Sequence, residues 1–146
     1  DLGTRTGWAL RTRDGLINGG SELFRRAASK AAACAICASS AGSPSLKRCA
    51  DGLDLVVFES VRRHAGVDAA HAYGEVGQLT AWCEDHQIPY QGVPVGTIKK
   101  HATGKGNANK QAMIAAAQAR GLTPVDDNHA DALALLDWAL AQEVAP

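Results

Sequence analysis

Three acidic residues that lie far apart in the sequence have the settings expected of ligands for a divalent metal ion. Asp1 opens the segment DLGTRTG, Glu59 follows the apolar run LVVF, and Asp131 lies within DDNHADALALL. A carboxylate at the end of a buried strand is costly unless it is paired with a cation or binds a metal ion. Carboxylate oxygens are the ligands that Mg²⁺ and Mn²⁺ prefer. We therefore expect the fold to gather these carboxylates around metal.

A basic, glycine-rich segment, TIKKHATGKGNANKQ, lies between Glu59 and Asp131 and contains no acidic residue. Its glycine-rich loop runs into a predicted helix N-terminus, where backbone amides and the helix dipole favour an oxyanion. It is not a Walker A loop, because the glycine spacing differs and no Lys-Ser/Thr pair is present. A solvated basic loop is the plainer interpretation. Lysines that meet phosphate beside metal-binding carboxylates are typical of a metal-dependent nuclease; the lysines are Lys99, Lys100, Lys105 and Lys110.

The residues that follow Glu59 are basic. Arg62, Arg63 and His64 would form a positive rim beside a negative site and could contact DNA. A simple salt bridge from Glu59 to Arg62 or Arg63 is the alternative interpretation.

The segment before Asp131 could supply a further ligand. On a helix, residues three or four apart share a face, so Asp131 would lie over Asn128 and Asp127. An acidic first turn also complements the helix dipole, which is the alternative explanation for Asp126 and Asp127. Asp131 lies a full turn further along, where the dipole explains less.

Composition indicates one domain with enough chain for a core: 146 residues, 46% of them hydrophobic. The formal net charge is zero, which argues against a protein that binds nucleic acid over its whole surface. No apolar run has the length of a membrane span and no signal peptide is visible, so we expect a cytoplasmic protein, bacterial or from a phage-infected host. Because the DLGT motif normally ends a strand, we expect the chain to lack part of its first strand.

The cysteines admit a zinc interpretation, in which Cys34, Cys37 and Cys49 supply three ligands and Cys83 or His86 a remote fourth; a disulfide is a further alternative. The spacing lacks a second paired half, however, and the neighbouring alanine-rich stretch does not resemble a zinc knuckle. We interpret them as structural or incidental thiols; they are Cys34, Cys37, Cys49 and Cys83.

The pattern along the chain predicts an α/β fold. Asp14-Gly15 between two short extended runs indicates a hairpin, the start of an antiparallel meander. Strands and helices then alternate, which predicts a mixed sheet flanked by helices. The expected later elements are a helix over Leu23–Ala38, a strand over Leu53–Phe58, a helix over Asp68–Asp85, a strand over Tyr90–Val93, helices over Pro94–Lys100 and Asn107–Arg120, and a last helix from Asp126 or Asp127 with Leu133, Leu136 and Leu140 buried.

Taken together and in this order, these motifs resemble the RuvC-type Holliday-junction resolvases, particularly the phage and prophage branch of that ribonuclease-H-like superfamily. The match covers Asp1 to Asn18 and Leu53 to Leu140. It implies that residues 1–146 form a single domain of this type. The family's first metal-binding Asp, followed by Gly, falls on Asp1, and its Glu at a strand end falls on Glu59. Its Asp-Ala-Leu-Ala falls on Asp131 to Ala134.

The resemblance also implies roles for basic residues, since the family's two phosphate-facing lysines fall on Lys99 and Lys110. Two departures stand out. Asn128 occupies a place usually filled by Asp or His, so either its amide oxygen or Asp127 completes the metal site. Arg62 replaces a stacking Phe of bacterial members.

The resemblance implies a structure-selective endonuclease that would use two Mg²⁺ ions, or Mn²⁺ in their place, to cut phosphodiesters in branched DNA. The twofold symmetry of a four-way junction implies a homodimer, paired through the Asp68–Asp85 helix. Two other functions stay open. One is a non-catalytic DNA-binding descendant of the same fold; the other is an actin-like nucleotide-binding module, suggested by DLGTRTG alone.

Overall fold

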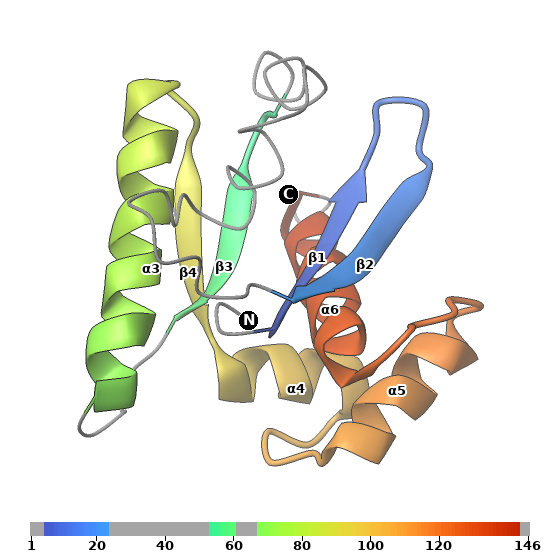
Figure 1. The fold of residues 1–146 in the computed structure, drawn as a ribbon. Helices are drawn as coiled ribbons and strands as arrows, with labels where there is room; N and C mark the ends of the chain where they lie inside the picture. Colours follow the sequence, from blue (N-terminus) through green and yellow to red (C-terminus); the bar gives the residue numbers. More distant parts are fainter. Residues whose placement is uncertain (1–4, 24–52, 61–66, 144–146) are drawn as a thin grey trace.

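A computed structural model describes residues 5–23, 53–60 and 67–143. The predicted helix over 23–38 lies outside these ranges except for Leu23, which ends a strand, and Cys34, Cys37 and Cys49 also lie outside them. The elements are β1 (Arg5–Arg11), β2 (Ile17–Leu23), β3 (Val56–Ser60), α3 (Val67–Asp85), β4 (Tyr90–Pro94), α4 (Val95–Thr103), α5 (Lys110–Ala119) and α6 (Asp127–Glu143). Strands and helices alternate as predicted, and Figure 1 shows helices beside two strand pairs.

Strands β1 and β2 form the predicted antiparallel hairpin, with Arg5 opposite Leu23 and Arg11 opposite Ile17. The turn closes through the Gly15 amide, which donates to the Thr12 carbonyl over 2.9 Å. Gly15 has a φ of 86°, a left-handed conformation that glycine adopts without a steric penalty. The sequence predicts extended runs over Gly7–Arg11 and Leu16–Asn18. In the structure β1 begins earlier, at Arg5, and β2 continues to Leu23, because these added residues still pair in the ladder.

One face of this hairpin is made of small residues. Side chains alternate between the two faces of a strand pair, and the register pairs Gly7 with Ser21 and Ala9 with Gly19. These four residues therefore share a face. Their size lets another element approach the strand backbone closely, and that element is α6.

Strands β3 and β4 form a parallel pair, with Val56 opposite Tyr90 and Glu59 opposite Val93. Helix α3 connects them, as a parallel crossover requires. One apolar cluster joins this helix to the strands and contains Val56, Leu79, Cys83 and Ile88. Cys83 is a buried thiol in that cluster, as expected of a structural cysteine.

Helix α6 occupies the centre of the described structure, where it contacts β1, β2, β3, α4 and α5 (Figure 1). A second apolar cluster forms around it from Val93, Ile98, Ala108, Met113, Ala130, Ala134 and Leu135. The predicted buried line was only partly right: Leu133 is buried, whereas Leu136 and Leu140 are partly exposed. Because α6 is covered on several sides, its alanines carry much of the packing. Within the described ranges, no helix is long and apolar enough to cross a membrane.

Candidate active site

The first turn of α6 is fixed by hydrogen bonds from its own sequence. The Asp126 carboxylate accepts from the His129 amide over 2.9 Å, and the Asp126 carbonyl accepts from the Ala130 amide over 3.1 Å. An Asp at this position satisfies amides that a helix start otherwise leaves without partners. The helix therefore begins at Asp127, as predicted, and sets the backbone of Asp127, Asn128 and Asp131.

Asp131 is a partly buried carboxyl group whose pKa is raised above its ordinary value. Burial is the main cause, because removing a carboxylate from water disfavours its charged form. The positive charges of Lys99 and Lys110 act in the opposite direction, and the negative charge of Asp127 adds to the rise. The fold thus brings four predicted site residues from α4, α5 and α6 within electrostatic range of one another.

Lys110 and Asp127 form an ion pair between the first residues of α5 and α6. The hydrogen bond between them is the main cause of both pKa changes: the pKa of Asp127 is lowered and that of Lys110 is raised. Helix α5 starts here because the Asn109 side chain accepts from the Ala112 amide over 2.9 Å. Sequence reasoning assigned Asp127 to metal and Lys110 to phosphate, whereas the structure pairs these residues with each other.

Glu59 lies inside β3 rather than just after it, since the strand continues to Ser60. The predicted strand end at Phe58 was therefore wrong. Val57 packs against the apolar cluster that contains Ala130 and Ala134 of α6, and alternation along the strand puts Glu59 on the same face as Val57. Glu59 therefore faces the side of the sheet where α6 and Asp131 lie, as the metal-site hypothesis requires.

The remaining lysines of the basic segment lie on α4 and the loop that follows it. Lys100 and Lys105 are exposed, and the helix ends at Gly104, which has a φ of 78°. The Thr103 hydroxyl donates to the Lys99 carbonyl over 2.8 Å and accepts from the Lys105 amide over 3.2 Å. These bonds order the end of α4, so the basic segment is a structured turn and not a loose loop.

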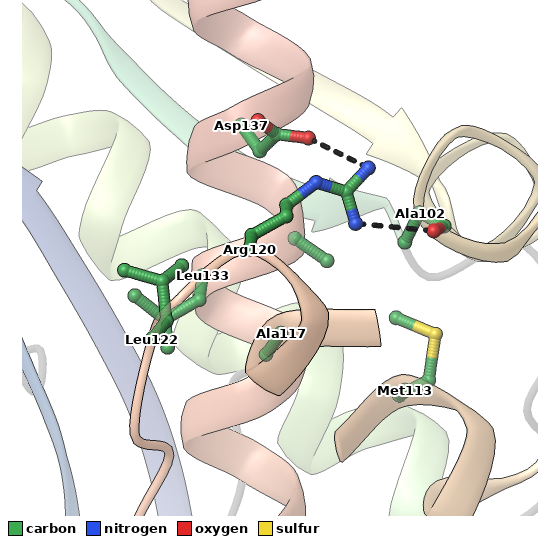
Figure 2. Close-up of a pocket in the computed structure, with 8 residues that line it drawn as sticks. Ala102, Met113, Ala117, Arg120, Leu122, Leu133 and Asp137 are labelled. Atoms are coloured by element: carbon green, nitrogen blue, oxygen red, sulfur yellow. Dashed lines mark hydrogen bonds and ion pairs between the residues drawn. The ribbon is translucent and has the colours of Figure 1, made fainter. Parts of the chain in front are cut away.

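A polar network around Asp137 of α6 connects the helices that carry these lysines (Figure 2). Arg120 donates to the Ala102 carbonyl over 3.1 Å and lies 3.2 Å from the Asp137 carboxylate. The same carboxylate lies 2.8 Å from Nε2 of His101. The adjoining cavity, lined by Met113 and Ala117 among others, is about 10 Å³, enough for no more than a water molecule. We regard this network as a support for α4, α5 and α6.

Four predicted site residues, Asp1, Arg62, Arg63 and His64, lie outside the described ranges. Over residues 5–23, 53–60 and 67–143, no group of three or more His, Cys, Asp or Glu side chains is placed to hold a metal ion. The metal site therefore stays a prediction that includes Asp1, and the donors predicted for it are oxygen atoms, the type that Mg²⁺ prefers.

Sequence reasoning missed three residues that shape this site. A Cβ atom on Gly7 would lie 1.9 Å from the Asn128 carbonyl oxygen, and one on Gly19 would lie 2.5 Å from Nε2 of His129. His129 itself is buried, and burial lowers its pKa. Glycine within a strand often marks a close approach of another backbone, so the glycines of β1 and β2 were the available signal.

No family model and no curated protein matches the chain. Among solved structures, the chain is similar to RuvC from Thermus thermophilus, with a TM-score of 0.60 and 17% sequence identity. The similarity covers 95% of this chain and 91% of that one. The chain therefore has a RuvC-like, mixed α/β fold, and the predicted ribonuclease-H-like fold class is confirmed.

Proposed function

We propose that the protein is a metal-dependent endonuclease that cuts phosphodiesters in branched DNA, as a resolvase of Holliday junctions. The observation that carries this proposal is the setting of Asp131: a partly buried carboxylate with a raised pKa, within electrostatic range of Lys99 and Lys110. Burying a charge is costly, and such a cost is common where a carboxylate serves a functional site. The RuvC-like fold supplies the matching context, although likeness of fold alone does not fix function.

The residues that would hold Mg²⁺ are Asp131, Glu59, Asp1 and Asn128. Asn128 and Asp127 both share a face with Asp131, and we favour Asn128 because the Asp127 carboxylate already binds Lys110. When bound, paired Mg²⁺ ions supply an activated water and stabilise the leaving oxygen of the phosphodiester.

The lysines would act on the phosphate itself. Lys110 lies at the start of α5, where the helix dipole also favours an anion. Asp127 would orient the Lys110 ammonium group until a phosphate takes the place of the Asp127 carboxylate. Lys99 would add positive charge from α4, and Lys100 and Lys105 would contact the DNA backbone further out. Such contacts make binding depend steeply on salt.

A four-way junction would be bound by two copies of the chain, paired through α3. This helix keeps an exposed face that includes Tyr73, Gly74 and Gly77. A Cβ atom on either glycine would meet nothing within 4 Å, so a second helix can approach the backbone closely there.

The test is cleavage of a synthetic four-way junction by the full chain and by Asp131→Asn in Mg²⁺. We expect the variant to bind the junction and to lose cleavage. The matched control is Asp85→Asn, because Asp85 is an exposed acid at the end of α3. Cleavage by Asp131→Asn at the wild-type rate would refute the metal assignment. A wild-type chain that binds junctions without any Mg²⁺-dependent product would identify the non-catalytic DNA-binding protein instead.

A further inference from the structure

His129 lies inside the acidic turn of α6 and has none of the roles assigned above. Its side chain is buried, and the residue is only 7% exposed. Nδ1 of the ring accepts a hydrogen bond from the Val125 amide over 3.1 Å. An accepting ring nitrogen carries no proton, so the ring is neutral and its proton lies on Nε2. Nε2 is buried and has no hydrogen-bond partner among the described residues.

The bonds of His129 form a reciprocal lock at the start of α6. Its backbone amide donates to the Asp126 side chain, while its ring accepts from the backbone amide just before Asp126. A capping box works in the same way, with Glu or Gln as the residue whose side chain reaches back. A Glu carboxylate would be costly here because the space is buried, whereas a neutral ring provides the acceptor without a charge.

The hairpin is shaped to receive this ring. A Cβ atom on Gly19 of β2 would lie 2.5 Å from Nε2, and one on Gly7 of β1 would lie 2.9 Å from the His129 amide nitrogen. The two glycines share the small-residue face of the hairpin. The ring edge is therefore seated directly on the backbone of β2, and the turn of α6 on that of β1.

We propose that His129 is a positioning residue that fixes the first turn of α6 to the β1–β2 hairpin and thereby holds Asp127, Asn128 and Asp131 in place. The role of those three residues rests on the proposed function. Groups that orient metal ligands affect metal affinity without touching the ion, commonly by about 10- to 100-fold. An aliphatic residue could fill the same space, but it would leave the Val125 amide without its acceptor.

Two substitutions at His129 separate its acceptor from its volume. His129→Asn keeps an acceptor atom close to the position of Nδ1, and His129→Leu keeps apolar volume but no acceptor. Gly19→Ala leaves His129 in place and pushes on its ring, and its Cβ would also come within 2.8 Å of the Trp8 carbonyl oxygen of β1. Gly20→Ala is the matched control in the same strand, because its Cβ would come no closer than 3.3 Å to the movable Trp8 side chain.

The first measurement is amide hydrogen exchange of the metal-free protein, read at Val125. Val125 is exposed, so its amide should lose protection when the ring bond is lost. We expect exchange roughly two- to tenfold faster in His129→Leu and Gly19→Ala, and near wild type in His129→Asn and Gly20→Ala. Unchanged protection of Val125 in His129→Leu would overturn the proposal, whatever the protein does with metal.

The second measurement is the dissociation constant of Mn²⁺, by calorimetry on the folded full chain. We expect it to rise about tenfold or more in His129→Leu and Gly19→Ala, with His129→Asn closer to wild type. Ile88→Val in the α3 cluster is a destabilised control that should leave Mn²⁺ binding unchanged. An equal rise in Ile88→Val would reduce His129 to a stability residue and overturn the proposal. If the wild-type chain binds no Mn²⁺, the proposed function fails, and the exchange result alone decides the role of His129.

Discussion

Replacing Asp131 by Asn should make the metal-free protein more stable, not less. The pKa of Asp131 is raised by burial, so the folded state binds a proton at this carboxyl more tightly than the unfolded chain does. The contribution of this carboxyl group to the free energy of unfolding is therefore largest below the ordinary Asp pKa of 3.8. The advantage is lost as pH rises through the raised folded-state pKa. At neutral pH the full penalty is present, and Asn removes it.

The size of this effect follows from the position of the side chain. Because Asp131 is only partly buried and has lysines nearby, the cost of burying it lies at the low end of the range for buried polar groups, and we expect a gain of about 1 kcal/mol. For a domain of this size that is about 3 °C in Tm. Mg²⁺ should reverse the order: at about 10 mM, with a dissociation constant near 1 mM, it would stabilise the wild type by about 1.4 kcal/mol.

The assay is thermal unfolding of the wild type, Asp131→Asn and Asp85→Asn, each in EDTA and in Mg²⁺ at pH 7. The Asp85 variant should follow the wild type in both buffers, because that side chain is exposed. A lower Tm for Asp131→Asn in EDTA would mean that the carboxylate stabilises the metal-free fold, contrary to the argument. An equal Mg²⁺ shift in wild type and Asp131→Asn would remove Asp131 from the metal site.

Other variants test the neighbouring contacts. Lys110→Ala should slow junction cleavage more than it weakens junction binding, and equal losses in the two assays would make Lys110 a docking residue. Because the pKa of Asp127 is lowered by Lys110, the pair stabilises the fold above pH 3.8 and loses that effect as pH falls through the lowered value. Urea unfolding of Lys110→Ala should therefore show a small loss of stability at pH 7 and a smaller one at pH 3. Gly7→Ala should destabilise the protein by about 1–3 kcal/mol, since a Cβ atom would overlap the Asn128 carbonyl. If urea unfolding gives the variant the same free energy of unfolding as the wild type, the hairpin can move away from α6.

The sequence was most informative where local chemistry decides the structure. Asp14-Gly15 predicted the hairpin because a tight turn favours glycine at a left-handed position, and Gly15 has that conformation. Asp126 was one of the two residues expected to begin the last helix, and it caps α6. The helix expected from Asn107 begins at Lys110 instead, where Asn109 caps it. The apolar run before Glu59 predicted a buried strand, and Val56 and Val57 do pack on opposite faces of β3.

The sequence was least informative where two distant segments meet. Lys110 and Asp127 were each assigned from their own helix starts, and nothing local shows that the two starts touch. The role of His129 depends on Gly19 of β2, a residue more than a hundred positions earlier in the chain. Strand boundaries also differed, because β3 extends as far as β4 can pair with it and not as far as its apolar residues run.

The meeting of α5 and α6 explains why acids and lysines are mixed at this site. Both helices begin there, and a helix start carries a partial positive charge from its unpaired amides. Lys110 and Lys99 add full positive charges beside Asp131. Such a place favours anions, and Asp126 and Asp127 use part of that positive field for capping and pairing. Asp131 lies one turn further along α6, where the positive field of the helix start is weaker, and it is partly buried. Burial therefore dominates its pKa. A phosphate could use the same positive field only if Lys110 leaves Asp127. The Asp127 carboxylate therefore competes with phosphate for Lys110, and salt screens both interactions.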